Sequence, residues 1–563
     1  MSKTFRLASA AAALFATCCA HAQQTPIQNV IVIFDENISF DHYFGTYPNA
    51  QNNAGETPFY ASAGTPSVNG LGPELLNNNP NRNAAGTQIN PQRFAPSQAY
   101  TCSMNHNYGP EQQAVDAGLM DGFVIHTGNT SEGCATDGST VMAYFDGNTV
   151  TALWNYAQYF AMSDNNFGST FGPSTPGVIN LVSGQTGQGI LHWATSNSSV
   201  YVPSGSSTTQ PVSGVTDIGD LDAYLDDCGN DKGGTVQSTA TLEMAGKNIG
   251  DLLNAANLSW GWFQGGFAPT TAAVYNSSTN TWTPAVCGAA HITHEYTSTN
   301  YNSWAIAPTT STVVPNPILH YTSDVHTSGN DYVSHHAGFQ FYASTRNPHH
   351  LAPTAAIGTT DQANHNYDMT VFFQALQNGQ LPAVSFLKAP YYQNGHPGNS
   401  DPTMEQIWIT QVVNAVQQSP YWNNAAIVIT YDDSDGWYDH VNGPLISTSN
   451  TASDALAGTN NCGTPSSGAI LGRCGHGPRL PLLVISPWAQ QNYVDHGLND
   501  QTSVIAFIEY NWNLSTIDGS APPNGQGAFD QNAGSLLPLF NFNQAPASYH
   551  VILNPNGSIG SIY

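Results

Sequence analysis

Residues 29–34 read Asn-Val-Ile-Val-Ile-Phe and residues 425–431 read Ala-Ala-Ile-Val-Ile-Thr-Tyr. Neither run alternates apolar with polar residues, which is typical of strands buried on both faces of a parallel sheet. Residues 383–387 and 480–486 have the same character. Between these runs lie three stretches with helical periodicity: 150–160, 403–417 and 502–512. Buried strands that alternate with helices predict an α/β fold with a largely parallel sheet.

Two long stretches interrupt this alternation. Residues 49–100 and 195–325 are rich in Asn, Gly, Ser, Thr and Pro. The clearest strands lie near both ends of the chain, which favours one sheet assembled from distant segments over several separate domains. We therefore expect residues 23–563 to form a single domain that carries both stretches as irregular insertions.

The composition is acidic but sparsely charged. The 563 residues include 10 Lys and Arg against 37 Asp and Glu, a formal net charge of −27, yet only 8% of the chain is charged. Apolar residues make up 40%, which is enough to build a large core and excludes disorder driven by charge. Binding to a nucleic-acid backbone needs a basic surface, so the composition also argues against a nucleic-acid partner.

The N-terminus has the pattern of a secretion signal. Lys3 and Arg6 precede an apolar run over residues 7–17, and Ala-His-Ala at 20–22 matches a signal-peptidase site. A membrane anchor is the alternative, but it needs about 20 apolar residues and this run is shorter. We therefore predict a removable signal over residues 1–22, no integral membrane segment, and export to the periplasm or the external medium.

The cysteines also indicate an exported protein. Six lie beyond the predicted signal, none of them in a CxxC pair. An even number in an exported chain favours disulfides over a metal cluster, although spacing alone leaves the connectivity open. We predict pairing between neighbours in the sequence: Cys102 with Cys134, Cys228 with Cys287, and Cys462 with Cys474.

Acidic and amide residues follow the two strongest strand patterns. They are Asp35, Glu36 and Asn37 after the first, and Asp432, Asp433 and Asp435 after the second. Ligands of parallel α/β sheets bind beyond the carboxyl ends of the strands. Carboxylates and an amide gathered there suit a divalent metal and would otherwise repel one another. The alternative to a metal site is that residues 433–439 form an ordinary acidic turn.

Histidines form a second group of candidates. Six lie beside Gly, Pro, Asn or aromatic residues: His106, His335, His336, His349, His350 and His396. A single loop histidine is usually structural or solvated. In a chain with so few Lys and Arg, however, histidine is the main available donor to an anion and a natural general acid.

A hydroxyl pair, Ser174 and Thr175, lies in the turn Phe-Gly-Pro-Ser-Thr-Pro-Gly at residues 171–177. By itself this pattern indicates only a rigid turn. The GxSxG elbow of α/β hydrolases is not present here.

Residues 36–46, Glu-Asn-Ile-Ser-Phe-Asp-His-Tyr-Phe-Gly-Thr, resemble the ENRSFDHYFGT motif of a bacterial phosphoesterase family. That family contains the non-haemolytic phospholipases C and secreted acid phosphatases. Further matches follow in family order from residue 29 to about 512, among them segments 172–177, 331–345, 395–402, 431–441, 477–489 and 500–512. Ile38 stands where the family usually has Arg, and residues 399–401 differ from the phospholipases.

The resemblance implies an alkaline-phosphatase-like, three-layer α/β/α sandwich and hydrolysis of a phosphate ester at one divalent metal ion. The implied metal ligands are Glu36, Asn37, Ser174, Asp432 and Asp433. The implied catalytic residues are Ser174 as nucleophile and His106, His335, His336 and His396. The implied substrate-binding residues are Asn37, His106, His336 and His396. Oxygen ligands leave calcium, magnesium, manganese and zinc open.

Within this family the sequence favours a secreted acid phosphatase that hydrolyses phosphate monoesters through a phosphoserine. Ser174 in Gly-Pro-Ser-Thr resembles the phosphatase branch, whereas the phospholipases tend to have Thr there. Phospholipase C acting on phosphatidylcholine-type diesters is the alternative, so the expected ligand is a phosphate ester or a phospholipid head group. An acidic binding or surface-layer protein would explain the composition, but not the carboxylates and histidines. Few Lys and Arg also predict an acidic pH optimum, at which histidines are protonated.

Overall fold

The computed structural model describes residues 23–131, 133–288, 330–447, 454, 462, 470–517 and 527–563. Within them, an eight-stranded sheet has the strand order β13-β10-β14-β1-β15-β16-β4-β17. The strands are β1 (Asn29–Asp35), β4 (Ala161–Ser163), β10 (Trp260–Gln264), β13 (Asn366–Asp368), β14 (Val384–Lys388), β15 (Ala425–Tyr431), β16 (Leu482–Ile485) and β17 (Tyr493–Asp495). The predicted secretion signal lies outside the described residues.

The sheet is parallel except at one strand. β1 pairs in parallel with β14 on one side and β15 on the other, and its register places Asp35 opposite Tyr431. β16 runs antiparallel to both of its neighbours, β15 and β4. The predicted α/β class with a largely parallel sheet is therefore confirmed.

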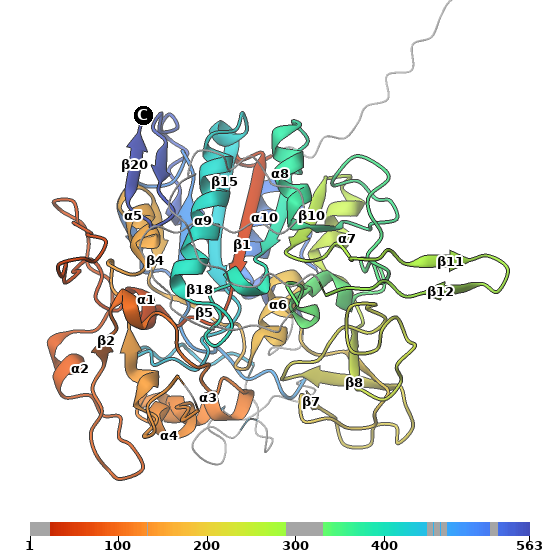
Figure 1. Ribbon diagram of the computed structural model, residues 1–563, viewed down its shortest axis with the longest axis horizontal. Coiled ribbons are helices and arrows are strands. Elements are labelled where there is room, and N and C mark those ends of the chain that lie inside the picture. The colour runs from red at the N-terminus through yellow and green to blue at the C-terminus, as the bar shows by residue number, and fades with distance from the viewer. Residues whose placement is uncertain are drawn as a thin grey trace, which may run out of the picture.

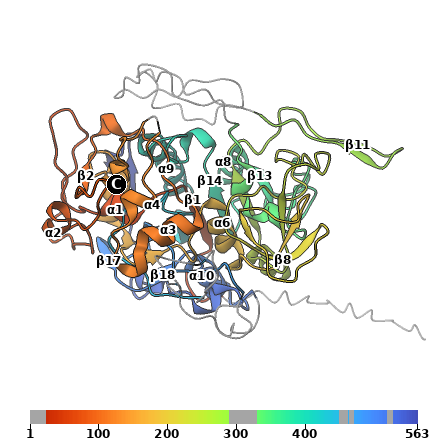
Figure 2. The ribbon, with the colours of Figure 1, turned by 90° about the horizontal axis from the view of Figure 1, so that it is seen from below.

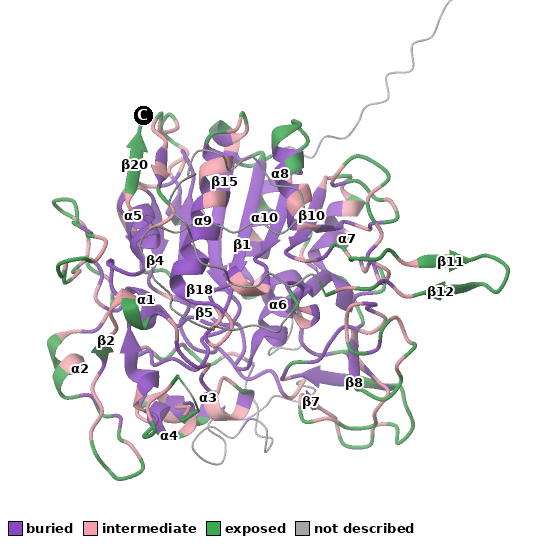
Figure 3. Cartoon of the chain, viewed as in Figure 1, coloured by how far each residue is buried: buried purple, intermediate pink, exposed green. Residues whose placement is uncertain are grey.

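Helices cover both faces of this sheet. Figure 2 shows α8 (Met369–Gln377) and α9 (Pro402–Gln417) on one face, with α6 (Ser174–Ser183) and α10 (Ser503–Trp512) on the other. Every residue of β1 and β15 is buried, which agrees with their unbroken apolar runs (Figure 3). The layers are therefore helix, sheet and helix, as expected.

Shorter elements surround these layers. They are α1 (Phe40–Phe44), α2 (Pro73–Asn77), α3 (Tyr108–Val115), α4 (Phe123–His126), α5 (Thr151–Tyr159), α7 (Ile249–Ala255), β2 (Gln92–Arg93), β3 (Ala143–Tyr144), β5 (Asn166–Phe167), β18 (Asn499–Asp500), β19 (Val551–Leu553) and β20 (Ile559–Ile562). No helix among the described residues is both long and apolar enough to cross a membrane.

The stretch expected as an insertion over residues 195–325 needs a correction. Its segment Trp-Gly-Trp-Phe-Gln forms β10, which lies inside the central sheet between β13 and β14. Other described parts of the stretch form separate elements. β7 (Val200–Tyr201), β8 (Val212–Asp217) and β9 (Thr241–Met244) make a second sheet with β6 (Gly189–His192), which precedes the stretch, and the hairpin of β11 (Val274–Asn276) and β12 (Thr281–Thr283) projects from the body (Figure 1). An aromatic strand with two tryptophans lacks the β-branched run that marked the others.

Three disulfides join the pairs predicted from the sequence. The Cα–Cα distances are 5.6 Å for Cys102–Cys134, 5.4 Å for Cys228–Cys287 and 6.1 Å for Cys462–Cys474. These distances lie in the range that a disulfide spans. The prediction of sequential pairing is confirmed.

Candidate active site

Three neighbouring strands end at one edge of the sheet and bring charged side chains together there. Glu36 follows β1, Asp432 follows β15, and Lys388 is the last residue of β14. All three are buried. The Lys388 ammonium lies 2.5 Å from Glu36 Oε1 and 3.0 Å from Asp432 Oδ2. The carboxyl ends of these parallel strands therefore form a buried ionic centre.

Asn37 turns the chain at this edge. It adopts a left-handed conformation with φ of 61°, which Asn tolerates better than most residues. Its backbone N–H donates to Asp432 Oδ1 at 3.0 Å, and its side-chain amide donates to Asp435 Oδ1 at 3.2 Å. The buried Asn37 Oδ1 accepts no hydrogen bond from any described residue. A buried, unpaired oxygen beside carboxylates is a typical ligand of a hard cation.

Helix α6 delivers a hydroxyl to the same centre. Ser174 is its first residue, is buried, and donates from Oγ to Asp433 Oδ2 at 3.1 Å. Gly177 lies in the same helix and allows α6 to pack closely against the backbone of Asp432, because a Cβ at this position would lie 2.1 Å from the Asp432 carbonyl oxygen. Asn37 thus contacts Asp432, Ser174 contacts Asp433, and Glu36 and Asp432 share the Lys388 ammonium, so the five residues lie at one edge of the sheet.

Two of the predicted histidines reach this centre from an adjacent turn. His336 Nδ1 lies 2.7 Å from Glu36 Oε1. His335 Nδ1 lies 3.7 Å from Asp222 Oδ1 and its ring centroid is 4.4 Å from that of His336. The predicted pair at 335–336 therefore lies beside the carboxylates.

The other two predicted histidines face each other nearby. His106 Nδ1 lies 3.0 Å from Asp435 Oδ1, and its Nε2 lies 3.4 Å from the Asn37 amide nitrogen. The His106 and His396 ring centroids are 5.9 Å apart. His349 and His350 do not join the group; they pair with Asp227 and Asp226, respectively.

Burial and neighbouring charges set the protonation of these groups. Burial lowers the pKa of His335, but Asp220 and Asp222 outweigh it and raise that pKa to about 9. Asp433 and Asp435 likewise outweigh burial and raise the pKa of His106 well above its ordinary value. Two histidines thus carry a proton at neutral pH, and the idea that only acid conditions charge the histidines does not hold for them.

The remaining groups favour an added cation. Burial, and then Glu36, raises the pKa of Asp432, and burial raises the pKa of Asp433 well above its usual value. Glu36, His336 and Asp432 each offer one ligand atom within 4.8 Å of the others. Such crowded, buried carboxylates are costly unless a cation compensates them. The residues present therefore fit a divalent metal held mainly by oxygen ligands.

Comparison with known proteins agrees with this geometry. The family model described as Phosphoesterase family matches residues 27–515. The chain belongs to the phosphoesterase family. Membership supports a phosphoric ester hydrolase and disfavours the non-enzymatic alternative, and this family is generally metal-dependent.

Named relatives of this phosphoesterase are phospholipases C. A non-hemolytic phospholipase C of Burkholderia pseudomallei is 24% identical over 554 residues, which cover 94% of this chain and 61% of that protein. A non-hemolytic phospholipase C of Pseudomonas aeruginosa is 32% identical over 169 residues, 29% of this chain and 24% of the relative. The Arabidopsis thaliana non-specific phospholipase C6 is 28% identical over 166 residues, 27% of this chain and 30% of the relative. The chain spans about three fifths of the Burkholderia protein.

Two further residues of the phosphoesterase motif at 36–46, Ser39 and Asp41, make contacts next to the carboxylate centre. Ser39 caps α1 by accepting from the His42 backbone N–H at 3.3 Å. Asp41 receives the Arg479 guanidinium at 3.0 Å and lies 2.6 Å from His440 Nδ1. The motif thus contains Glu36 and Asn37 of the carboxylate centre, and its Asp41 joins a buried ionic network with Arg479 and His440.

The sequence did not point to Lys388 as part of the site, and it grouped Asp35 with the residues expected near a metal. Lys388 directly follows the predicted strand 383–387, so its position at the strand end was the available signal. Asp35 is buried with neither oxygen hydrogen-bonded to a described residue, and its pKa is raised by burial and by Glu405 of α9. Strand alternation therefore places Asp35 toward the α9 layer and Glu36 toward the α6 layer.

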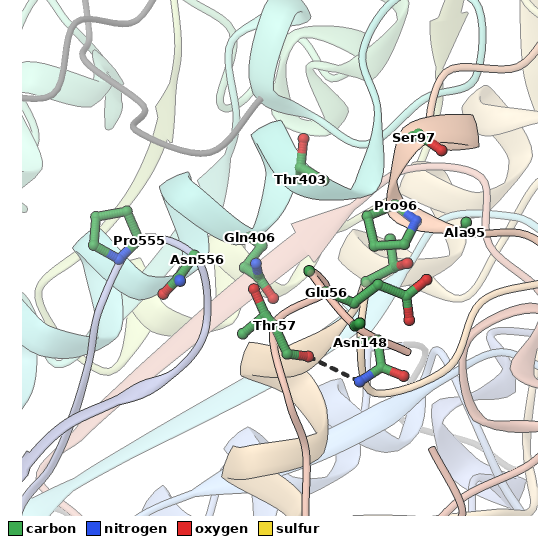
Figure 4. Close-up of a pocket in the computed structure, with 13 residues that line it drawn as sticks. Glu56, Thr57, Ala95, Pro96, Ser97, Asn148, Thr403, Gln406, Pro555 and Asn556 are labelled. Carbon is green, nitrogen blue, oxygen red and sulfur yellow. Dashed lines mark hydrogen bonds between the residues drawn. The ribbon is translucent and has the colours of Figure 1, made fainter. Parts of the chain in front are cut away.

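A separate cavity of about 380 Å³ lies between the loop at 54–57 and the first turns of α9. Figure 4 shows Thr57, Asn148 and Gln406 along its wall. None of the predicted site residues lines it.

Proposed function

We propose that this phosphoesterase hydrolyses phosphate esters through a phosphoserine on Ser174, at a site where Glu36, Asn37, Asp432 and Asp433 hold one divalent metal with the Ser174 hydroxyl. One observation carries the proposal: the Ser174 hydroxyl lies 3.1 Å from Asp433 inside a buried carboxylate centre at the carboxyl ends of two parallel strands. A serine in this setting is positioned for nucleophilic attack rather than for solvation.

Bound at these oxygens, a divalent cation supplies Lewis acidity, which lowers the pKa of a nearby hydroxyl and neutralises phosphoryl charge. The chain's own groups do the positioning. Asp433 orients the Ser174 hydroxyl by accepting its hydrogen bond. The N-terminus of α6, which begins at this residue, favours negative charge on the oxygen and on the phosphoryl group that approaches it.

The reaction follows as two displacements at phosphorus. Ser174 gives its hydroxyl proton to Asp433, its Oγ forms a bond to phosphorus while the ester P–O bond breaks, and the leaving alkoxide takes a proton from a histidine. His106 is suited to this role, because Asp433 and Asp435 keep it protonated. Water then attacks the phosphoserine and gives one proton to that histidine, the P–Oγ bond breaks, and Ser174 Oγ takes its proton back from Asp433.

The remaining histidines are suited to hold the phosphoryl oxygens. His335 carries a proton at neutral pH and is half-buried, so it can donate to an anion. His336, whose pKa burial and the neighbouring His335 lower, is neutral and hydrogen-bonds as an uncharged ring. Asn37 and His396 complete the proposed set of substrate contacts. Hydrogen-bond donors aimed at the non-bridging oxygens provide much of the rate gain in phosphoryl transfer.

The names of the relatives favour a phospholipid diester as substrate. We therefore place phospholipase C activity first, with a diacylglycerol as leaving group and the head-group phosphate on Ser174. Acid phosphatase is the second candidate, because Ser174 in Gly-Pro-Ser-Thr resembles the phosphatase branch of the family.

Hydrolysis rates on p-nitrophenyl phosphorylcholine and on p-nitrophenyl phosphate, across pH and with or without chelator, separate these candidates. Phospholipase C activity predicts faster turnover of the diester and release of diacylglycerol from phosphatidylcholine vesicles. A phosphatase predicts turnover of the monoester alone. Absence of hydrolysis on both, with metal supplied, would refute the proposed function.

We also propose that residues 23–563 form one phosphoesterase catalytic domain that works after export. The three disulfides favour an oxidising compartment, and the pattern at residues 1–22 supports a secretion signal. Both the periplasm and the external medium meet this requirement.

A further inference from the structure

We propose that Lys388 is a built-in cation that occupies the position of a second metal ion and so limits the site to one divalent ion. The inference rests on the proposed function, in that Glu36 and Asp432 are taken as metal ligands. It assigns Lys388 a positioning role, because its ammonium contacts these carboxylates and not the reacting atoms.

The Lys388 ammonium lies between two of the residues proposed as metal ligands, Glu36 and Asp432. Glu36, His336 and Asp432 offer ligand atoms within 4.8 Å of one another. Lys388 Nζ lies 2.5 Å from Glu36 Oε1 and 3.0 Å from Asp432 Oδ2, two of these three ligands. The Lys388 ammonium, a cation that belongs to the chain itself, therefore already occupies the position between the Glu36 and Asp432 carboxylates.

Lys388 is held rigidly in that position. Its backbone is paired within the sheet, opposite Gln264 of β10, and its carbonyl accepts from the Gly265 N–H at 3.0 Å. Its ammonium also donates to the Asp35 carbonyl at 3.4 Å and lies 4.7 Å from the centre of the Phe34 ring. The side chain is fully buried, so water does not screen its charge.

Lys388 contacts one oxygen of Glu36 and one oxygen of Asp432. Lys388 and His336 both contact Glu36 Oε1, whereas Glu36 Oε2 accepts no hydrogen bond from the described residues. Lys388 contacts Asp432 Oδ2, whereas Oδ1 accepts backbone N–H groups from Asn37 and Asp433. Glu36 thus keeps one oxygen for a metal ion and gives the other to the lysine, whereas Asp432 would bind a metal through an oxygen that already has a hydrogen-bonded or ionic partner.

Charge balance supports the same division. Glu36, Asp432 and Asp433 contribute three negative charges when ionised, and one divalent ion together with Lys388 supplies three positive charges. Asp435 is not counted among these three carboxylates; it lies 3.0 Å from His106 Nδ1. Loss of the lysine would leave one buried negative charge uncompensated, which is costly and attracts a further cation.

Counting bound ions tests the inference directly. Equilibrium dialysis of the full chain against Mn²⁺, with metal and protein measured in the same sample, gives ions per chain for the wild type and three variants. We expect Lys388→Met to bind one ion more than the wild type at saturation. Lys388→Arg, which keeps the charge, and Lys247→Met, which removes an exposed lysine, should each match the wild type.

An unchanged or lower ion count in Lys388→Met would overturn the inference. If that variant does not fold, as judged by circular dichroism, Lys388→Gln replaces it. A wild type that binds two ions within the carboxylate centre would also overturn the inference. The Glu36→Gln variant shows whether an ion binds there, because it should bind fewer ions than the wild type if Glu36 is a ligand. A wild type that binds one ion but hydrolyses no phosphate ester would refute the proposed function and leave the ion count standing.

Discussion

Replacing Ser174 with Ala should separate catalysis from stability. The hydroxyl makes one hydrogen bond, to Asp433, and does not cap α6. Its loss should therefore cost about 1 kcal/mol of folding free energy, which corresponds to a fall in Tm of about 1–2 °C in a chain this large. Loss of a nucleophile, in contrast, should lower kcat by roughly 10⁴-fold or more. Tm from calorimetry and kcat on p-nitrophenyl phosphorylcholine, or on p-nitrophenyl phosphate if only the monoester is turned over, measure the two effects.

Thr175→Val is the matched control. The Thr175 hydroxyl lies next in the chain but donates to Asp220 Oδ1 at 3.1 Å, away from Asp433. This variant should keep kcat within about tenfold of the wild type, since it loses a hydrogen bond and not a nucleophile. An active Ser174→Ala enzyme combined with an inactive Thr175→Val enzyme would move the nucleophile to Thr175 and refute the reasoning.

Three further predictions concern the metal, pH and the disulfides. Asp433→Asn should lower metal occupancy at least about tenfold, because one charged ligand is lost; elemental analysis that finds full occupancy would remove Asp433 from the ligand set. Burial raises the pKa of Glu405 from its ordinary value of 4.5 to about 8. Between these two values the folded chain binds more protons at Glu405 than the unfolded chain does. The free energy of unfolding should therefore fall as pH rises from about 4.5 to 8. Glu405→Gln should flatten that part of a plot of Tm against pH, and an unchanged slope would contradict the assignment. Replacing Cys228 and Cys287 with Ser should destabilise the chain by about 4 kcal/mol, since their disulfide closes a loop with a sequence separation of 59; denaturant unfolding that shows no loss would contradict this value.

The central strands were predictable because their sequences leave little choice. β1 and β15 are apolar at nearly every position, and the predicted bounds differ from the observed ones by at most one residue. β10 was missed, since two tryptophans and a glycine do not form a β-branched run. The reversed direction of β16 was also not predictable, because a buried strand has the same composition in either direction.

The site was predictable to the extent that its residues follow strands directly. Glu36 and Asp432 meet because β1 and β15 are neighbours in register, which the parallel-sheet rule anticipates. Lys388 was not predicted, since the strand pattern does not show that β14 lies on the other side of β1. The protonation of His335 depends on Asp220 and Asp222, which come from a distant loop and are invisible to local sequence patterns.

A trapped phosphoserine tests the central claim most directly. The chain is mixed with p-nitrophenyl phosphorylcholine or p-nitrophenyl phosphate during turnover, quenched in acid and digested, and the peptide that contains residues 171–177 is sequenced by mass spectrometry. We predict a phosphoryl group, or the phosphorylcholine group of the diester, on Ser174. The same group on Thr175, or an unmodified Ser174 in a sample that turns over substrate, would contradict the account.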